Sequence, residues 1–185
     1  LNTTGADNVA VGYLALDANT TASGNTAVGK EALTTCTSGH SNTAVGNFAL
    51  QDLTTGNHCT AIGKSALADN TTGTQNVAVG NFTLFAATTA SNNTAVGTSS
   101  LGTNTTGGDN AALGVAALND NTTGSNNTSA GVSSLRSCTT GSNNTGLGHQ
   151  AGNDITTGSN NTCIGSNSDT PSATADNNFI LGNSS

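Results

Sequence analysis

The chain of 185 residues has no tryptophan, no methionine, one proline, four phenylalanines and one tyrosine. Hydrophobic residues of all kinds make up 33% of it. The large side chains that fill compact cores are therefore scarce, which argues against an ordinary globular domain.

Charge is scarce too. Charged residues make up 7% of the chain, against about a quarter in an average soluble domain. The cations are Lys30, Lys64 and Arg136, and the formal net charge is -7. This balance disfavours binding to nucleic acid or to an anionic membrane. No apolar run approaches the length of a membrane span, so we expect no membrane insertion.

The four cysteines show no C-x-x-C spacing, so zinc and redox motifs are absent. We expect Cys36, Cys59, Cys138 and Cys163 to act as small apolar residues pointing inward. A disulfide between Cys36 and Cys59 is the less favoured alternative.

What the chain does have is a repeat. The sequence Asn-Thr-Ala-Val-Gly stands at 25–29, 42–46 and 93–97. If its glycine is counted as position 17, equivalent glycines follow at every seventeenth residue from Gly12 to Gly182. The consensus is x-x-A-L-x-x-N-T-T-G-x-x-N-T-A-V-G. A strict period without insertions indicates that each repeat occupies an equivalent place in a stack.

Five columns of the repeat carry the structure in our interpretation. Glycine at position 17 and asparagine at position 13 are stacking elements, leucine at position 4 and valine at position 16 fill the coil, and alanine at position 15 faces a neighbouring chain. The asparagines form either an amide ladder or a set of corners, and the sequence leaves both readings open. Representative members are Asn25, Asn42, Asn93, Gly29, Gly46, Gly97, Leu33, Leu50, Val28 and Val45.

The residue types predict an all-β fold. Thr, Val and Ile favour strands, Gly and Asn supply corners, and seventeen residues are too few for a helix pair. We predict a parallel β-solenoid (β-roll or β-helix) of 17-residue coils over residues 1–165, with two or three short strands per coil. Residues 166–185, with Asp169 in place of the core leucine and Pro171 nearby, are expected to form a degenerate last coil, or the junction to a missing C-terminal domain. Because the chain starts in mid-repeat, we expect it to be a segment of a longer protein.

The adjacent apolar pairs at positions 3 and 4 and at positions 15 and 16 put apolar atoms on both sides of the backbone. One side fills the coil, and the other would form stripes best covered by further copies of the chain, so we expect a homo-oligomer.

The stretch "NTAVGNFALQDLTTGNHCTAIGKSAL" resembles the tandem repeats of phage and bacterial fibre proteins. It is similar, more loosely, to the β-roll head repeats of trimeric autotransporter adhesins. The tail "ADNNFILGNSS" resembles the segment that precedes an intramolecular chaperone of the endosialidase type. The resemblance implies a homotrimer, a location outside the cell, on a cell surface or on a virion, and an adhesive or structural role.

We expect no enzyme, no catalytic residue, no cofactor and no metal. The run from Gly146 to Ala151 matches the dinucleotide pattern G-x-G-x-x-A, but no helix follows it. Catalysis needs one irregular constellation, and the acidic residues are scattered. Possible surface contacts lie at variable positions: His40, His58, Phe82, Asp109 and His149. His40 and His58 lie in neighbouring coils, where a weak metal site in a trimer is less expected than two solvated side chains.

Our first hypothesis is a stiff fibre segment, in a phage tail fibre or bacterial appendage, that displays variable loops to a cell-surface or particulate ligand. The second is a monomeric ice- or surface-binding solenoid that uses the threonines of positions 8 and 9, although ice-binding solenoids resemble a Thr-x-Thr spacing that the repeat lacks. The third is a filament of chains stacked end to end.

Overall fold

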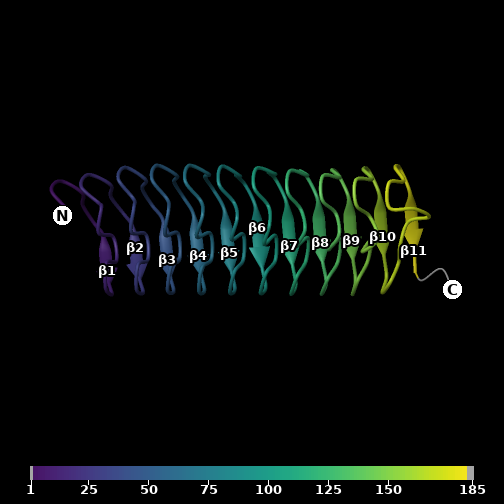
Figure 1. Ribbon diagram of the computed structural model, residues 1–185, viewed down its shortest axis with the longest axis horizontal. Coiled ribbons are helices and arrows are strands. Elements are labelled where there is room, and N and C mark those ends of the chain that lie inside the picture. Colours follow the sequence, from purple (N-terminus) through teal and green to yellow (C-terminus); the bar gives the residue numbers. More distant parts are fainter. Residues whose placement is uncertain (1, 183–185) are drawn as a thin grey trace.

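The structure is a computed structural model, and it describes residues 2–182. Eleven strands of three residues form one parallel sheet in sequence order (Figure 1). The strands are β1 (Val9–Val11), β2 (Thr26–Val28), β3 (Thr43–Val45), β4 (Thr60–Ile62), β5 (Val77–Val79), β6 (Thr94–Val96), β7 (Ala111–Leu113), β8 (Thr128–Ala130), β9 (Thr145–Leu147), β10 (Thr162–Ile164) and β11 (Phe179–Leu181). Each residue pairs with the one 17 positions further on, as Ala44 pairs with Ala61. The predicted parallel β-solenoid with 17-residue coils is confirmed.

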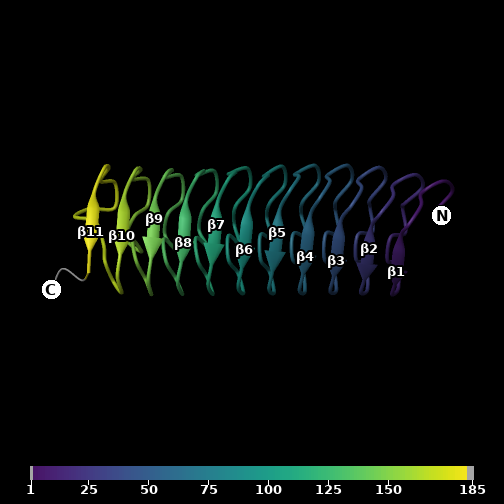
Figure 2. The same cartoon turned by 180° about the vertical axis from the view of Figure 1, so that it is seen from behind.

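Each described coil contains one strand, so the prediction of two or three strands per coil is wrong. The remaining residues form turns that stack on the same turns of the next coil (Figures 1 and 2). Backbone hydrogen bonds continue through these turns: the Leu50 N–H donates to the Ala66 carbonyl at 3.0 Å, and the Thr71 N–H donates to the Thr88 carbonyl at 2.9 Å. The turns therefore satisfy their backbone groups along the stack, as strands do.

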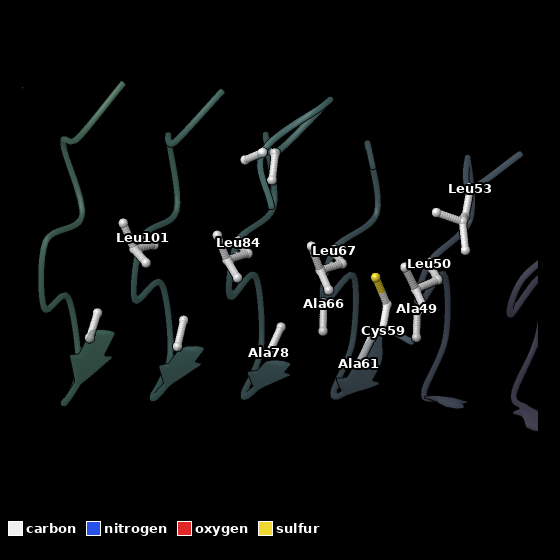
Figure 3. Close-up of a cluster of buried hydrophobic side chains, with 14 of the residues drawn as sticks. Ala49, Leu50, Leu53, Cys59, Ala61, Ala66, Leu67, Ala78, Leu84 and Leu101 are labelled. Atoms are coloured by element: carbon white, nitrogen blue, oxygen red, sulfur yellow. The ribbon is translucent and has the colours of Figure 1, made fainter. Parts of the chain in front are cut away.

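The leucines of position 4 form the centre of the core. From Leu33 to Leu135 they are fully buried, and Figure 3 shows Leu50, Leu67, Leu84 and Leu101 in one row. All have left-handed backbone angles, with Leu84 at φ 49° and Leu33 at φ 53°. Such a conformation costs roughly 1–2 kcal/mol for a residue other than glycine, and burying a leucine side chain contributes about as much or more.

The two faces of each strand are the reverse of our interpretation. Ala44 and Ala61 at position 15 are fully buried, whereas Val45 at position 16 is partly exposed and Ile62 is 41% exposed. The leucine column explains the reversal, because it fills the space behind the strand. A Cβ added to Gly146 at position 15 would lie 2.5 Å from Oγ of Ser134 and 2.8 Å from Cγ of Leu135, so a large side chain does not fit in such a coil and the branched side chains point outward.

The asparagine column forms a ladder, although only partly by the amide-to-amide bonds that we considered. In the common step, the side-chain oxygen accepts from the next asparagine's backbone N–H, as Asn25 does from Asn42 at 2.9 Å. Nδ2 of Asn25 donates to the Gly39 carbonyl of that same coil at 2.8 Å. Direct amide-to-amide bonds also occur, as from Asn110 to Asn93 at 3.1 Å. The column thus cross-links coils and closes corners at once.

Cys59 replaces one asparagine of this ladder and reproduces part of its bonding. Its thiol lies 3.4 Å from the Gly73 carbonyl of the next coil. In other coils, Nδ2 of the asparagine donates to the equivalent carbonyl, as Asn42 does to Gly56. Its sulfur also interacts with the backbone and the side chain of Asn76. The substitution therefore preserves the stack.

The coil after residue 165 continues the stack, because β11 pairs in register with β10. Its interior differs: Asp169 stands at the leucine position, and one of its side-chain oxygens accepts from the Asp154 N–H at 3.1 Å. Burial raises the pKa of this carboxyl. The segment that resembles the one before an endosialidase-type chaperone spans residues 175–185. Its last three residues, 183–185, lie outside the described range.

Candidate functional site

Residues 2–182 form a continuous rod without an enclosed pocket. In that same range, no three His, Cys, Asp or Glu side chains gather where they could hold a metal ion. The described part of the chain also contains no helix long and apolar enough to cross a membrane. The features of interest are two exposed surfaces.

The first surface is the sheet face, which we define as the side chains of positions 14 and 16 in β1 to β11. Position 16 presents a row of aliphatic side chains, among which Val96 is 39% and Leu113 is 47% exposed. Position 14 is usually threonine, and the hydroxyls of Thr43, Thr60 and Thr94 have no hydrogen-bond partner within the described residues. The parallel register keeps both rows straight.

The threonines of positions 8 and 9 behave differently from one another. Position 8 hydroxyls donate to backbone carbonyls of the next coil, as Thr54 does to Thr71 at 3.0 Å and Thr105 does to Thr122 at 3.0 Å. Position 9 side chains, such as Thr72, are exposed. Position 8 thus holds the stack together, and its hydroxyl protons are not available to a ligand.

The second surface is the corner ridge, which lies where the chain turns after each strand. We define it as Tyr13, Lys30, Phe48, Lys64 and Phe82, from positions 1 and 2 of five successive coils. Nζ of Lys30 lies 5.4 Å from the ring centroid of Phe48, and Nζ of Lys64 lies 5.4 Å from that of Phe82. Such distances are those of cation–π contacts. The ridge therefore alternates aromatic and cationic side chains from coil to coil.

Neighbouring polar groups complete the ridge. Lys30 forms an ion pair of 3.2 Å with Glu31, and Gln51 donates to Glu31 at 3.3 Å. Phe85 packs edge to face on Phe82 at 5.9 Å between ring centroids. Four of the five aromatic residues of the chain and both lysines thus belong to this ridge or contact it.

The predicted surface residues all lie on the outside, at separate places. Phe82 belongs to the corner ridge. His40 and His58 lie together, with ring centroids 5.1 Å apart in an edge-to-face arrangement. Asp109 and His149 are exposed in other coils. Of the five, the structure brings only the two histidines into contact with one another.

The four cysteines are buried and free. Burial raises the pKa of the Cys138 and Cys163 thiols to about 11, and it raises those of Cys36 and Cys59 as well. The prediction that they fill inward positions is confirmed, and the alternative disulfide between Cys36 and Cys59 is not formed.

No protein-family model, curated protein or solved structure matches this chain. Any function proposed for it therefore depends on its own residues and geometry.

Phe82 was predicted from the sequence as a surface contact, but the ridge around it was not. The signal was a Lys at position 1 followed one coil later by a Phe at position 2, at Lys30 with Phe48 and again at Lys64 with Phe82. It becomes visible when positions 1 and 2 are read down the stack rather than along the chain.

Proposed function

We propose that this chain is a structural segment of an extracellular fibre, in which several copies, three by the resemblance to trimeric fibres, associate through their sheet faces and display their corners outward. The observation that carries the proposal is the row of outward side chains at position 16, which are Val, Ile or Leu in every strand except β8, where Ala130 stands. Large contiguous apolar surface on a folded protein marks an interaction site. The alanine column cannot serve this purpose, because it lies inside the coil.

The size of the sheet face suits association. Eleven strands spaced about 4.8 Å apart, each about 10 Å long, give a footprint of roughly 500 Å² per chain. Two such faces amount to about 1,000 Å², near the lower bound for a specific interface. The area grows with every added repeat, so a long array associates more tightly than a short one.

The near absence of charge supports the same proposal. Positions 14 and 16 carry no charged residue in any strand, so no like charges meet when identical faces pack together. In a rod of identical coils, a charged position would place like charges about 4.8 Å apart along the whole length.

Sedimentation equilibrium in native buffer tests the proposal, with a trimer expected. A paired substitution on the sheet face, Val45→Lys with Val79→Lys, is expected to yield monomers that keep the circular dichroism of the fold. The matched control, Thr72→Lys with Thr106→Lys, places the same charges at exposed position 9 and leaves the assembly intact. A monomeric wild-type chain would contradict the fibre proposal.

The second candidate is an ice- or surface-binding solenoid, and one observation favours it. Thr94 and Val96 both point outward from β6, and the pattern recurs along a straight, uncharged sheet. The two functions compete for the same face, because a face covered by other chains is closed to ice. Thermal hysteresis by a monomer would establish this candidate, and its absence would exclude ice binding.

A further inference from the structure

The corner ridge has a periodicity of its own, longer than the coil. Tyr13, Phe48 and Phe82 belong to every second coil, with a lysine in each coil between them. Coils stack about 4.8 Å apart, so the coils that carry the aromatic residues recur roughly every 10 Å along the rod axis, with Tyr13 at position 1 and the two phenylalanines at position 2. In the coils after Phe82, positions 1 and 2 carry no Phe, Tyr or Trp, and their one ring is that of His149.

The backbone beneath the ridge is rigid. The Phe48 N–H donates to the Lys30 carbonyl and the Phe82 N–H donates to the Lys64 carbonyl, both at 3.0 Å. The coils between them are linked in the same way, since the Ser65 N–H donates to the Asn47 carbonyl at 2.9 Å. The spacing of the residues that carry the rings is thus set by the stack, so a ligand would not have to order the backbone on binding.

The rings are accessible from solvent. Tyr13 is 68% exposed and Phe82 is 41% exposed. Phe48 is partly exposed. Aromatic side chains supply flat apolar surface. These three rings lie on the outside, so they are not needed to fill the core of the rod. A regular row of such surfaces fits an extended polymer better than a small molecule, which would need an enclosed pocket.

The chemistry beside the rings is that of hydroxyl recognition. The Lys30 and Lys64 ammonium groups can donate hydrogen bonds. The side-chain oxygen of exposed Asn81 accepts from the backbone N–H of Lys64 at 3.2 Å, so the Nδ2 of this amide is a further donor at the surface. The two lysines do not make the surface strongly cationic, since Glu31 pairs with Lys30 and the chain carries a net charge of -7. A neutral polymer suits this ridge better than a polyanion.

We propose that the corner ridge binds an extended, neutral β-1,4-linked polysaccharide, whose sugar rings pack on the exposed parts of Tyr13, Phe48 and Phe82 beside the lysines that lie over the two phenylalanine rings. In such a polymer alternate sugars present the same face, and their spacing is close to that of the three aromatic rings. This inference rests on the proposed function only in requiring that the ridge faces outward from the assembled fibre. It names the class of ligand that the fibre would hold.

The repeat itself supplies conservative substitutions for a test. Position 2 is serine in Ser65, Ser99 and Ser133, which share the left-handed backbone of Phe48 and Phe82. Position 1 is serine at Ser166. The triple variant Tyr13→Ser, Phe48→Ser, Phe82→Ser therefore removes the rings while keeping side chains that these positions already accept. The control is Val115→Ser with Val132→Ser, which removes exposed apolar side chains from position 1 where no aromatic is present.

Isothermal titration with cellohexaose and with chitohexaose is expected to show binding of at least one of them, with the α-linked maltohexaose inert. The triple variant should lower the association constant about tenfold or more, and the valine control should leave it unchanged. The inference is overturned if neither β-linked sugar binds, or if the triple variant, with an unchanged melting temperature, binds as the wild type does.

Sedimentation of the same samples separates this inference from the fibre proposal. A trimer that binds none of the sugars refutes the ridge and leaves the fibre. A monomer that binds through the three rings refutes the fibre and leaves the ridge.

Discussion

The side-chain oxygen of Asn127 accepts a hydrogen bond of 2.9 Å from the backbone N–H of Asn144, one coil further along the rod. Nδ2 of Asn127 donates to the Gly141 carbonyl of that coil, also at 2.9 Å. One buried side chain therefore satisfies two backbone groups of the next coil, and the same arrangement recurs through most of the stack.

Replacing this residue is expected to leave the Asn144 N–H without a partner and the Gly141 carbonyl with only the Cys138 thiol, at 3.5 Å. Because each buried unsatisfied group costs about 1–3 kcal/mol, Asn127→Ala should lower the free energy of unfolding by about 2–4 kcal/mol. The control is Asn126→Ser, at the exposed neighbouring position 12. Serine already stands at this position in Ser41, where φ is 58°, close to the 59° of Asn126. Thermal denaturation of the two variants checks the prediction, and equal melting temperatures would contradict it.

The leucine column gives a second prediction. Leu84 is fully buried, so Leu84→Ala should cost about 2–5 kcal/mol by loss of transfer free energy and by the cavity left behind. Val132→Ala removes an exposed side chain, and we expect it to change the stability by less than about 0.5 kcal/mol. Urea denaturation measures both. A loss confined to the coils around Leu84, visible by hydrogen exchange, is expected for a stack whose coils contact only their neighbours.

A third prediction concerns the glycine that closes each coil. Gly63 has φ 134°, and a Cβ there would overlap the carbonyl of Gly80 in the next coil. Gly63→Ala should therefore prevent normal stacking at that point and yield a protease-sensitive chain. Gly108 has no such backbone angle, and position 11 is serine in Ser91, Ser125 and Ser142. Gly108→Ser should keep the resistance of the wild type, and limited proteolysis compares the two.

The buried cysteines give a fourth prediction, on pH. A thiol whose pKa is raised in the folded state stays protonated after the unfolded chain has ionised. Its contribution to stability is thus fully present below the usual pKa of 9.0 and is lost as the pH rises to about 11, the value for Cys138. The denaturation midpoint should decrease between pH 9.0 and about 11. It should decrease less steeply in Cys138→Asn, which has no thiol at this site and carries the asparagine that Asn121 provides at the same position of the repeat.

Thiol labelling at pH 8 provides a second readout. Burial keeps all four cysteines neutral and shielded, so we expect them to react with a disulfide reagent only after denaturation. Rapid labelling of the native chain would contradict the buried positions of these residues.

The sequence predicted the parallel solenoid, the period of its coils and the burial of Leu33 and Leu50, since these depend on the register alone. It misassigned the faces of the strand. In Thr-Ala-Val, either Ala44 or Val45 could have pointed inward, because both are apolar. The choice depends on how much space the leucine on the opposite side leaves, which is a property of the folded coil.

The number of strands was misjudged for a related reason. Leu84 and Phe82 adopt left-handed backbone angles, which bulky residues rarely do. The intrinsic backbone preferences of such residues favour extended structure. Only the stacking of identical turns, with hydrogen bonds to the coils on both sides, stabilises this conformation.

The uniform register of the coils makes the length of the rod adjustable. Inserting or deleting one 17-residue unit would add or remove one step of about 4.8 Å and would keep the register of every column, because each residue pairs with the one 17 positions further on. Unequal recombination between repeats would produce such changes in single events. A lineage carrying this sequence could therefore change the length of the rod in equal increments, and could relocate the aromatic ridge along it, while the register of the core columns stays the same.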